Sequence, residues 1–589
     1  MSQRAHELHQ SAISAAQRGE RERALDLIDQ AIAIEPGDAG KQRDRALILM
    51  MLGRLPEALA SCERALELEP DSWEGLMRRG NLLSELGRID AALASYDQAV
   101  RVAPRNAQVH YNRGVTMLKA ERWSEALESF DRTIGIDPRR LDALLNRGFV
   151  LEKLRRFDGA LSSYDAAISI DPRSATVHSN RGNALRELER LPEALASLER
   201  ALALDPNHVR AHINRGVVLS DLDRFEEALA SFQRAIDLQA DSAQAHYLRG
   251  TALVRAGNFD AAIQSYEQAI RLEPGYADAH EALSFALLIT GKLERGWVEH
   301  EWRRTRRNLG ARGTARAWLG QESVAGKVVL LRCEAGIGDT LQFCRYAPMV
   351  AALGARVVLE VQKSLSGLLH QMPGVDTIIE RGDSSVAADY YCSLMSLPVV
   401  FGTRLDSIPA RTRYVQSDPE AVARWRARLG QHDRFRVGVA FSGNPEHLND
   451  AHRSIPLAEL MRHMPREIEF HSLQMDVRPT DRPTLTASQG IVDHAADVVG
   501  MSTTAALCEC MDVILSVDTS IAHLAAAIGK RVWLLLPQVG LDWRWLLSRD
   551  DSPWYPSMRL YRQELPGNWE PVLRRVAKDL TSARLTDGL

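Results

Sequence analysis

Residues 330–343 read LLRCEAGIGDTLQF, and this stretch combines a buried strand, a glycine loop and the first turn of a helix. Gly336 and Gly338 lie in the loop, where we expect the backbone to turn sharply and side chains to clash. One acid, Asp339, follows at the helix start. Because open α/β sheets bind ligands at the carboxyl ends of their strands, the stretch predicts a parallel sheet with a functional acid at its edge.

The sequence around this stretch alternates strands and helices in two series. The first begins at Lys327 with VVLLR, ARVVLEV and VDTIIE, and the second begins at Phe435 with RVGVAFSG, IEFHSLQ, DVILSVDT and RVWLLLP. Such alternation predicts parallel, Rossmann-like sheets. We therefore expect two α/β lobes, residues 327–432 and 433–589, with a cleft between them.

Polar residues follow the strands of the second series and are candidates for ligand binding. They are Ser442, Gly443, Asn444, Arg453, Gln474, Asp518, Thr519, Ser520 and His523. The residues after DVILSV begin a helix, whose first turn presents unpaired N–H groups and a positive dipole end, and this favours a phosphate site. The alternative is that Asp518 and Ser520 only cap the helix.

The first half of the chain carries a 34-residue repeat, which is marked by prolines and glycines at fixed spacing. The prolines are Pro36, Pro70, Pro104, Pro138, Pro172, Pro206 and Pro274, and the glycines are Gly80, Gly114, Gly148, Gly182, Gly216 and Gly250. Apolar residues at helical spacing predict two helices per period, with the glycines where the helices approach closely. This pattern resembles the tetratricopeptide repeat, with about eight units and a partial cap. The resemblance implies an α-solenoid over residues 1–302, stacked as a right-handed superhelix with a concave surface for a partner.

One asparagine recurs in four repeats within the pattern NRG: Asn112, Asn146, Asn180 and Asn214. An amide offers both a donor and an acceptor, so a row of amides can bind an extended peptide. This half resembles the arm of the O-linked N-acetylglucosamine transferases, and the resemblance implies a groove for an acceptor protein. The alternative is that these residues satisfy backbone groups between repeats. We expect the neighbouring arginines to pair with acids of adjacent repeats, and the recurring histidines to be packing residues rather than metal ligands.

Arginines crowd the junction at residues 303–326, which we expect to be a linker. They are Arg303, Arg304, Arg306, Arg307, Arg312 and Arg316. A solvated linker helix is the favoured interpretation of this charge run. The alternative is that some of these arginines face the cleft and meet an anionic sugar or phosphate.

Three motifs in order, GIGD, SGNPEHLNDAHRSIPL and SVDTSIAHLAAAIGKRVWLLLP, resemble the heptosyltransferase-like family of GT-B glycosyltransferases. The resemblance covers about residues 327–565, and the tail DWRWLLSRDDSPWYPSMRLYRQ is similar to members with tetratricopeptide arms that are implicated in flagellin glycosylation. It implies a nucleotide-sugar donor held by the polar residues above, with Arg453 neutralising its phosphates, and Asp339 as the base of an inverting transfer.

Some roles stay open within this resemblance. Asp339 would only cap its helix if Glu334 were the base, or if the domain were inactive. His447 and His452 are further candidates for contacts with the acceptor. No Asp-x-Asp pair is evident in residues 327–589, so we expect neither a metal nor a cofactor beside the nucleotide-sugar.

The net charge, the cysteine content and the hydrophobic stretches of the chain limit the classes of partner and location that we expect. The 589 residues have a formal net charge of -4, which gives no reason to expect nucleic acid as a partner. Six cysteines without a CxxC pair predict structural thiols in a reducing compartment. No stretch reaches the ~18 apolar residues of a membrane span, so we expect a cytoplasmic protein.

These observations favour a protein glycosyltransferase whose arm recruits the acceptor protein. An envelope saccharide glycosyltransferase and a non-enzymatic scaffold with a degenerate transferase domain are the alternatives. The sugar, the nucleotide, the acceptor and a homodimer formed through repeat edges stay open.

Overall fold

The computed structural model describes residues 2–306, 315–383, 385–446, 449–487 and 490–586. It divides into two compact units, Met1–Ala252 and Leu253–Leu589. The division falls within helix α15 (Ala243–Arg255), upstream of the arginine-rich junction. The last repeat helices are therefore part of the second unit.

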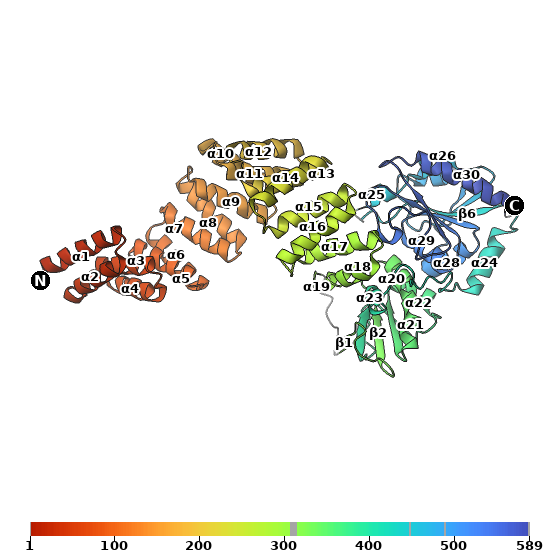
Figure 1. The fold of residues 1–589 in the computed structure, drawn as a ribbon, viewed down its shortest axis with the longest axis horizontal. Coiled ribbons are helices and arrows are strands. Elements are labelled where there is room, and N and C mark those ends of the chain that lie inside the picture. Colours follow the sequence, from red (N-terminus) through yellow and green to blue (C-terminus); the bar gives the residue numbers. More distant parts are fainter. Residues whose placement is uncertain (1, 307–314, 384, 447–448, 488–489, 587–589) are drawn as a thin grey trace. The chain divides into compact units, whose positions relative to one another are not determined.

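The first unit is built from consecutive helices that pack in pairs, α1 on α2, α3 on α4 and so on (Figure 1). Before α15 its helices are α1 (Ser2–Gln17), α2 (Arg21–Ile34), α3 (Ala39–Met51), α4 (Leu55–Leu68), α5 (Trp73–Glu85), α6 (Ile89–Val102), α7 (Ala107–Lys119), α8 (Trp123–Ile136), α9 (Leu141–Lys153), α10 (Phe157–Ile170), α11 (Ala175–Glu187), α12 (Leu191–Leu204), α13 (Val209–Asp221) and α14 (Phe225–Leu238). The predicted α-solenoid is confirmed.

The recurring glycines lie where the two helices of a repeat touch. A Cβ atom on Gly80 would lie 2.7 Å from the ring of Tyr96, and one on Gly216 would lie 2.6 Å from the ring of Phe232. Both rings are almost fully buried. This confirms that the small residue is required by close packing.

The turn between the two helices of each repeat contains one residue with positive φ. Early repeats place a glycine there, such as Gly53 (φ 74°) and Gly87 (φ 73°). The last two such turns also have glycine, Gly257 and Gly291, whereas four middle turns place other residues in the same left-handed conformation, at φ of 55° to 59°: Glu121, Arg155, Glu189 and Asp223. A side chain in this region costs about 1–2 kcal/mol, so these turns are strained.

The second unit begins with the remaining helices of the repeat region and continues into the α/β region. Its first helices are α16 (Phe259–Leu272), α17 (Ala277–Ile289), α18 (Leu293–His300) and α19 (Arg303–Arg306). The later helices are α20 (Ile337–Phe343), η1 (Cys344–Tyr346), α21 (Ala347–Ala352), α22 (Lys363–Leu369), η2 (Leu394–Ser396), α23 (Leu397–Val400), α24 (Pro419–Leu429), α25 (Asp450–Arg453), α26 (Leu457–His463), α27 (Arg482–Ala487), α28 (Met501–Glu509), α29 (Ser520–Ala527), η3 (Trp543–Trp545) and α30 (Glu570–Thr586).

Two parallel sheets form the cores of the two lobes. The first has the order β1-β5-β2-β3-β4 and the second has the order β11-β10-β9-β6-β7-β8, with every strand pairing parallel. The strands are β1 (Arg316–Ala317), β2 (Val328–Arg332), β3 (Arg356–Val361), β4 (Thr377–Glu380), β5 (Tyr390–Ser393), β6 (Arg436–Ala440), β7 (Glu469–Ser472), β8 (Ile491–Val492), β9 (Val513–Val517), β10 (Val532–Leu536) and β11 (Met558–Arg562). The seven apolar runs quoted above all form strands, which confirms the alternating α/β prediction.

The last repeat helix packs directly on the α/β region. Trp297 of α18 is 1% exposed. Its ring makes edge-on contacts with Phe343, Trp543 and Trp554, at centroid distances of 6.1, 5.1 and 6.0 Å. These aromatic contacts explain why α18 divides with the lobes rather than with the earlier repeats.

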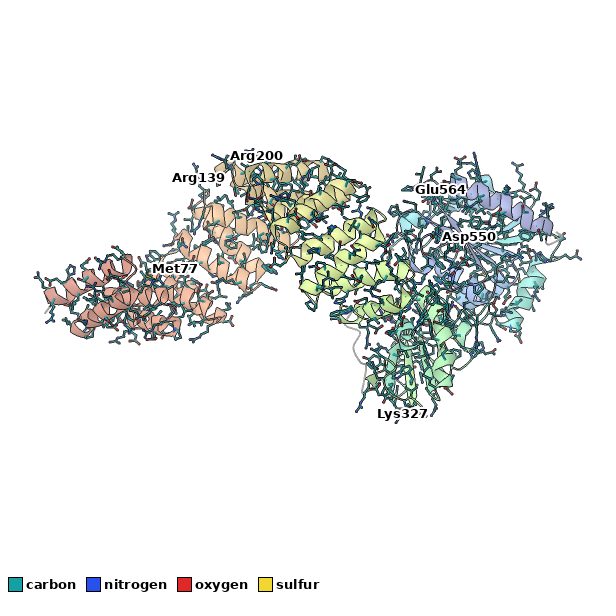
Figure 2. The ribbon with its side chains drawn as sticks, in the orientation of Figure 1. Met77, Arg139, Arg200, Lys327, Asp550 and Glu564 are labelled. Carbon is teal, nitrogen blue, oxygen red and sulfur yellow. The ribbon has the colours of Figure 1, made fainter. Side chains whose placement is uncertain are left out.

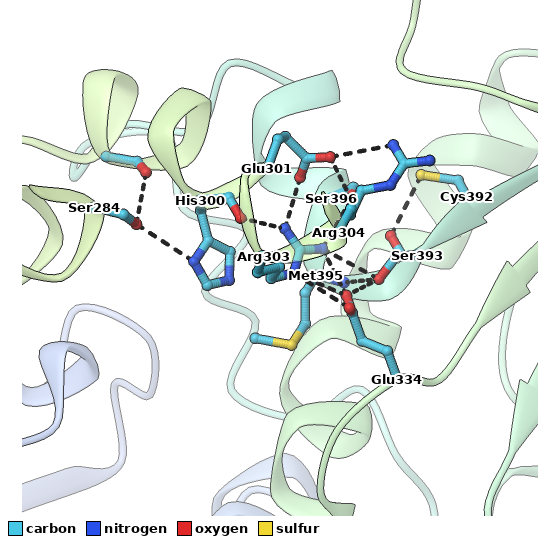
Figure 3. A network of polar contacts seen from close by, with 11 residues as sticks. Ser284, His300, Glu301, Arg303, Arg304, Glu334, Cys392, Ser393, Met395 and Ser396 are labelled. Carbon is cyan, nitrogen blue, oxygen red and sulfur yellow. Dashed lines mark hydrogen bonds and ion pairs between the residues drawn. The ribbon is translucent and has the colours of Figure 1, made fainter. Parts of the chain in front are cut away.

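The arginine-rich junction is not a solvated linker at its start, which corrects the favoured interpretation. Arg303 is 2% exposed. It pairs with Glu334 at 2.6 Å and with Glu301 at 2.8 Å, and it donates to Ser396 (Figure 3). A buried cation with two carboxylates ties α19 to the first lobe. Arg316 is exposed on β1.

Two further arginines of the junction, Arg307 and Arg312, lie outside the described residues. Charged side chains such as Arg139, Arg200 and Glu564 are exposed, as Figure 2 shows. All six cysteines are free and buried, as expected for structural thiols. Within the described ranges, no helix is long and apolar enough to span a bilayer.

Candidate active site

A cavity of about 700 Å³ opens in the second unit, beside the carboxyl ends of β6, β9 and β10 and the start of α20. The residues predicted from both lobes line it together. They are Gly336, Gly338, Asp339, Ser442, Gly443, Asn444, Arg453, Gln474, Asp518, Thr519, Ser520 and His523. The volume is within the ~300–1,000 Å³ range of sites for small molecules and cofactors.

Asp339 lies in the first turn of α20 and uses both carboxylate oxygens. Oδ2 accepts a hydrogen bond from the Gly336 N–H at 2.8 Å, so the acid does cap its helix. Oδ1 forms an ion pair with the Arg544 guanidinium. The same side chain lines the cavity, so the capping and ligand-facing roles coexist.

The two glycines of the loop act differently from our expectation. Gly336 has φ -73° and ψ 171°, an extended conformation open to any residue, and Gly338 lies within α20. The prediction of a sharp glycine turn is therefore wrong. The expected clash is confirmed at Gly338, because a Cβ there would lie 2.8 Å from Cδ2 of His523. Gly338 thus permits close contact between α20 of the first lobe and α29 of the second lobe.

Arg544 is a site residue that sequence reasoning missed. It lies in η3, is 7% exposed and lines the cavity. Besides Asp339, its guanidinium pairs with Asp542 at 2.8 Å and donates to the Gln342 side chain. The only indication in the sequence was the run DWRW soon after the last strand of the second series, because a 205-residue separation hides the pairing.

His523 is held as a neutral ring. Burial, with Arg544 and Arg345 nearby, holds its pKa well below the ordinary value. Its Nδ1 lies 2.8 Å from the Tyr555 hydroxyl. If that hydroxyl donates to Nδ1, the proton stays on Nε2, which can then donate to an anion in the cavity.

Asp518 does not cap α29, which corrects that alternative for this residue. Its Oδ2 accepts from the Trp545 indole at 2.9 Å, and Thr519, the N-cap residue, makes no capping bond through its side chain. Burial, followed by the charge of Asp542, raises the pKa of Asp518 to about 6. A buried carboxyl group with a raised pKa beside a cavity is typical of a functional site.

The polar groups that the second lobe contributes to the cavity either bond within the protein already or lack a hydrogen-bond partner among the described residues. Gln474 is occupied, because its amide bonds the backbone N–H and C=O of Ser442 at 3.4 and 3.1 Å. Ser442 Oγ is buried and has no hydrogen-bond partner among the described residues. Since buried hydroxyls are normally bonded, this atom is available to a ligand.

Arg453 is braced within the same lobe. It donates to the Asp518 carbonyl at 2.9 Å and pairs with Asp450 at 3.4 Å. A Cβ on Gly443 would lie 2.5 Å from the Arg453 guanidinium, so that glycine makes room for the arginine. Arg562 also lines the cavity and was not predicted.

Other candidates are not at the cavity. Glu334, the alternative base, is buried in the Arg303 network and does not line the cavity. His452 lies in α25 but is not among the lining residues, and His447 lies outside the described residues. No group of three His, Cys, Asp or Glu residues suited to a metal is found in the described part of the chain.

The asparagines of the repeats lie in the first unit, where three of them contact the preceding repeat. Asn112 donates to Asn81 at 3.1 Å, and Asn146 donates to the Tyr111 hydroxyl at 3.2 Å. Asn214 reaches a serine hydroxyl at 3.5 Å, and Asn180 has no hydrogen bond to any described residue. These contacts join side chains of adjacent repeats and not the backbone groups named in the alternative, and the peptide groove stays a prediction.

The neighbouring residues behave as expected. Arg113 pairs with Asp97 at 2.8 Å and Arg147 with Asp131 at 2.6 Å, which confirms pairing with acids of the preceding repeat. His110 lies 3.0 Å from the Pro104 carbonyl through Nε2. Recurring histidines thus bond the carbonyl of the proline in the turn before their own helix, a partner that their spacing alone did not indicate.

Comparisons with known proteins support the repeat assignment. The tetratricopeptide repeat family matches residues 9–72, 77–140, 118–175 and 179–245, with a further tetratricopeptide repeat at 243–276. The chain is a tetratricopeptide-repeat protein over about residues 9–290, with a C-terminal α/β region that carries two parallel sheets.

Protein FlbA of Caulobacter vibrioides is a distant homologue. It is 28% identical over 291 residues, which cover 45% of this chain and 48% of FlbA. The chain thus spans about half the length of that curated relative.

Solved structures of repeat proteins are also similar. YrrB, a TPR protein with an unusual peptide-binding site, is 22% identical with a TM-score of 0.27, over 32% of this chain and 96% of YrrB. PilW, a type IV pilus biogenesis factor, is 21% identical with a TM-score of 0.33, over 35% of this chain and 94% of PilW.

Proposed function

We propose that this protein is a glycosyltransferase that moves a sugar from a nucleotide-activated donor to a polypeptide recruited by the repeat arm. One observation carries the proposal. The acid expected to be the base and all the residues expected to hold the donor, from two lobes and nearly 200 residues apart in sequence, line the same cavity. The resemblance to the heptosyltransferase-like GT-B family supplies the reaction class.

The chemistry is a direct displacement at the anomeric carbon. The acceptor hydroxyl loses its proton to Asp339 as its oxygen bonds to the anomeric carbon, and the bond from that carbon to the nucleoside diphosphate breaks. Inversion follows from this single displacement. A positioned carboxylate base accounts for about 100-fold to 10,000-fold of the rate.

The residues around Asp339 fit this role. Arg544 holds one oxygen of Asp339 in place and is itself fixed by Asp542 and Gln342, so the carboxylate is preorganised. On the donor side, Arg453, the N-terminus of α29, the Ser442 hydroxyl and a neutral His523 offer donors to the leaving diphosphate.

The repeat arm supports a polypeptide acceptor rather than a small saccharide. Stacked repeats present an extended surface, which suits a protein partner more than a single sugar. Flagellin is the first acceptor to test, because the family resemblance extends to members implicated in its glycosylation. Transfer to an envelope saccharide and a scaffold without activity are the competing functions.

The test begins with ligand binding by the full chain. Thermal shifts with UDP, GDP, ADP and TDP should reveal one nucleotide that stabilises the protein by about 2.7 kcal/mol at 100 times its dissociation constant. The matching nucleotide-sugars are then incubated with flagellin, and intact mass is recorded. The expected result is that flagellin gains the mass of the sugar carried by the nucleotide-sugar supplied.

Two variants sharpen the test. Asp339→Asn should abolish transfer while nucleotide binding stays within a few-fold, and Asp433→Asn, an exposed acid of the second lobe, is the matched control. Full turnover by Asp339→Asn would refute the base assignment. The absence of any nucleotide shift would favour the scaffold.

A further inference from the structure

A second, smaller cavity lies beside the segment that joins the two lobes. Its volume is about 160 Å³, and its lining contains Arg345, Arg411, Arg413 and Tyr414 but no acid. Three prolines give it rigid walls. It is smaller than the ~300–1,000 Å³ of drug-sized sites, so a ligand that fits inside must be small.

Arg345 gives this cavity an unbalanced charge. The residue lies in η1, is 4% exposed and donates to three neutral acceptors: the Gln342 and Trp554 carbonyls at 2.7 and 2.6 Å, and the Tyr414 hydroxyl at 2.9 Å. No described carboxylate lies within ion-pair distance. Two of its five N–H groups remain for another partner. Burying a cation without a counterion costs desolvation free energy, so an anion that enters the cavity would be strongly attracted to the Arg345 guanidinium.

The joining segment adds a second unbalanced cation. Arg411 is exposed and has no ion pair to any described carboxylate, whereas Arg413 is already paired with Glu509. The cavity therefore carries two positive charges that are not balanced. A tetrahedral dianion matches both the charge and the forked geometry of guanidinium groups.

We propose that this cavity binds a small phosphate dianion, either inorganic phosphate or the terminal group of a phosphate monoester, held by Arg345 and Arg411. Bound phosphate joins η1 of the first lobe to the segment between the lobes. Tyr414 lies in the same segment, three residues after Arg411. Its backbone N–H donates to the Ala527 carbonyl of α29 at 3.0 Å. The anion therefore orders the connection between the lobes, independently of the transferase proposal.

The same contacts lead from this cavity toward the larger one. The Arg345 guanidinium lies 4.6 Å from the ring centroid of Tyr555, whose hydroxyl contacts His523. An anion that balances Arg345 removes part of the positive field at His523. Phosphate binding in the small cavity should thus change the electrostatic potential at His523 in the larger cavity.

Calorimetric titration of inorganic phosphate into the full chain, with sodium chloride keeping the ionic strength constant, tests the site. Arg411→Ala should weaken binding at least tenfold, because it removes an exposed side chain without disturbing the core. Arg466→Ala, which removes an exposed arginine of the second lobe, should change nothing. Equal phosphate affinity in Arg411→Ala and the unaltered protein would overturn the proposal.

The larger cavity also contains arginines, so Arg453→Ala serves to separate the two sites. Phosphate binding that survives Arg453→Ala but falls in Arg411→Ala supports the small cavity; the reverse pattern overturns it. Hydrogen exchange gives a second readout, since phosphate should protect the amides of residues 410–416. Glycerol 3-phosphate distinguishes the sources: binding of both probes means that a monoester enters, and binding of inorganic phosphate alone restricts the site to the free anion.

Discussion

Replacement of Asp518 by asparagine should stabilise the second unit at alkaline pH. The carboxyl group has a pKa raised from 3.8 to about 6, which corresponds to about 3 kcal/mol of destabilisation when the group is fully ionised. Part of the side chain faces the cavity, and screening by water lowers this figure to roughly 1–2 kcal/mol. Asparagine removes the charge and keeps an oxygen that can accept from Trp545.

The sign of the pH dependence follows from the direction of the shift. An acid whose folded pKa is raised binds its proton more tightly in the folded state, so its destabilising effect is present above pH 6 and disappears as the pH falls toward 4. Asp518→Asn should therefore melt higher than the unaltered protein at pH 8, by roughly 2–4 °C, and at the same temperature near pH 4.

Differential scanning calorimetry of the full chain at pH 8, 6 and 4 measures the effect on the transition of the second unit. Asp433→Asn, an exposed acid, controls for the general loss of a negative charge. If Asp518→Asn melts lower at pH 8, or if its shift is the same at every pH, the burial argument for Asp518 is refuted.

Three further predictions concern the repeats and their contact with the lobes. Gly216→Ala should destabilise the first unit by about 1–3 kcal/mol, because the new methyl group meets the buried ring of Phe232. Gly135→Ala is the control: open space surrounds Gly135 in α8, so this change should stabilise the unit by up to about 1 kcal/mol. Urea unfolding measures both. Glu189→Gly should stabilise the same unit by about 1 kcal/mol by relieving a left-handed residue, and an unchanged urea midpoint would contradict this. Trp297→Ala should cost the second unit about 3–5 kcal/mol, seen as a lower melting temperature, because it empties the aromatic contact with Trp543.

Local patterns predicted the repeats and the strands well. The 34-residue spacing of glycines such as Gly216 carries information about packing, because these glycines face a large side chain of the second helix in their own repeat, an aromatic ring at Gly216 and Leu198 at Gly182. Strands such as β9 and β10 are buried along their whole length, so they appear as continuous apolar runs. The residues that line the large cavity were found because they follow those strands directly.

Long-range partners were not predictable from spacing. The pair of Asp339 with Arg544 and the burial of Arg303 against Glu334 depend on tertiary contacts, and a run of arginines has the same composition whether it is solvated or buried. Strands β1 and β8 have only two residues each, too few to show the hydrophobic alternation that predicts a strand. Gly336 was misjudged because a glycine marks either a turn or a close approach, and only the backbone angles separate the two.

The attachment of α18 to the lobes through Trp297 divides the repeat array into an exchangeable part and a fixed part. Repeats upstream of residue 252 belong to the first unit, so their loss, gain or replacement leaves the aromatic contacts of the lobes intact. The terminal helices α16 to α18 are constrained by the second unit and should resist such rearrangement. Recombination at one joint could therefore exchange the upstream repeats while the two α/β lobes are inherited whole.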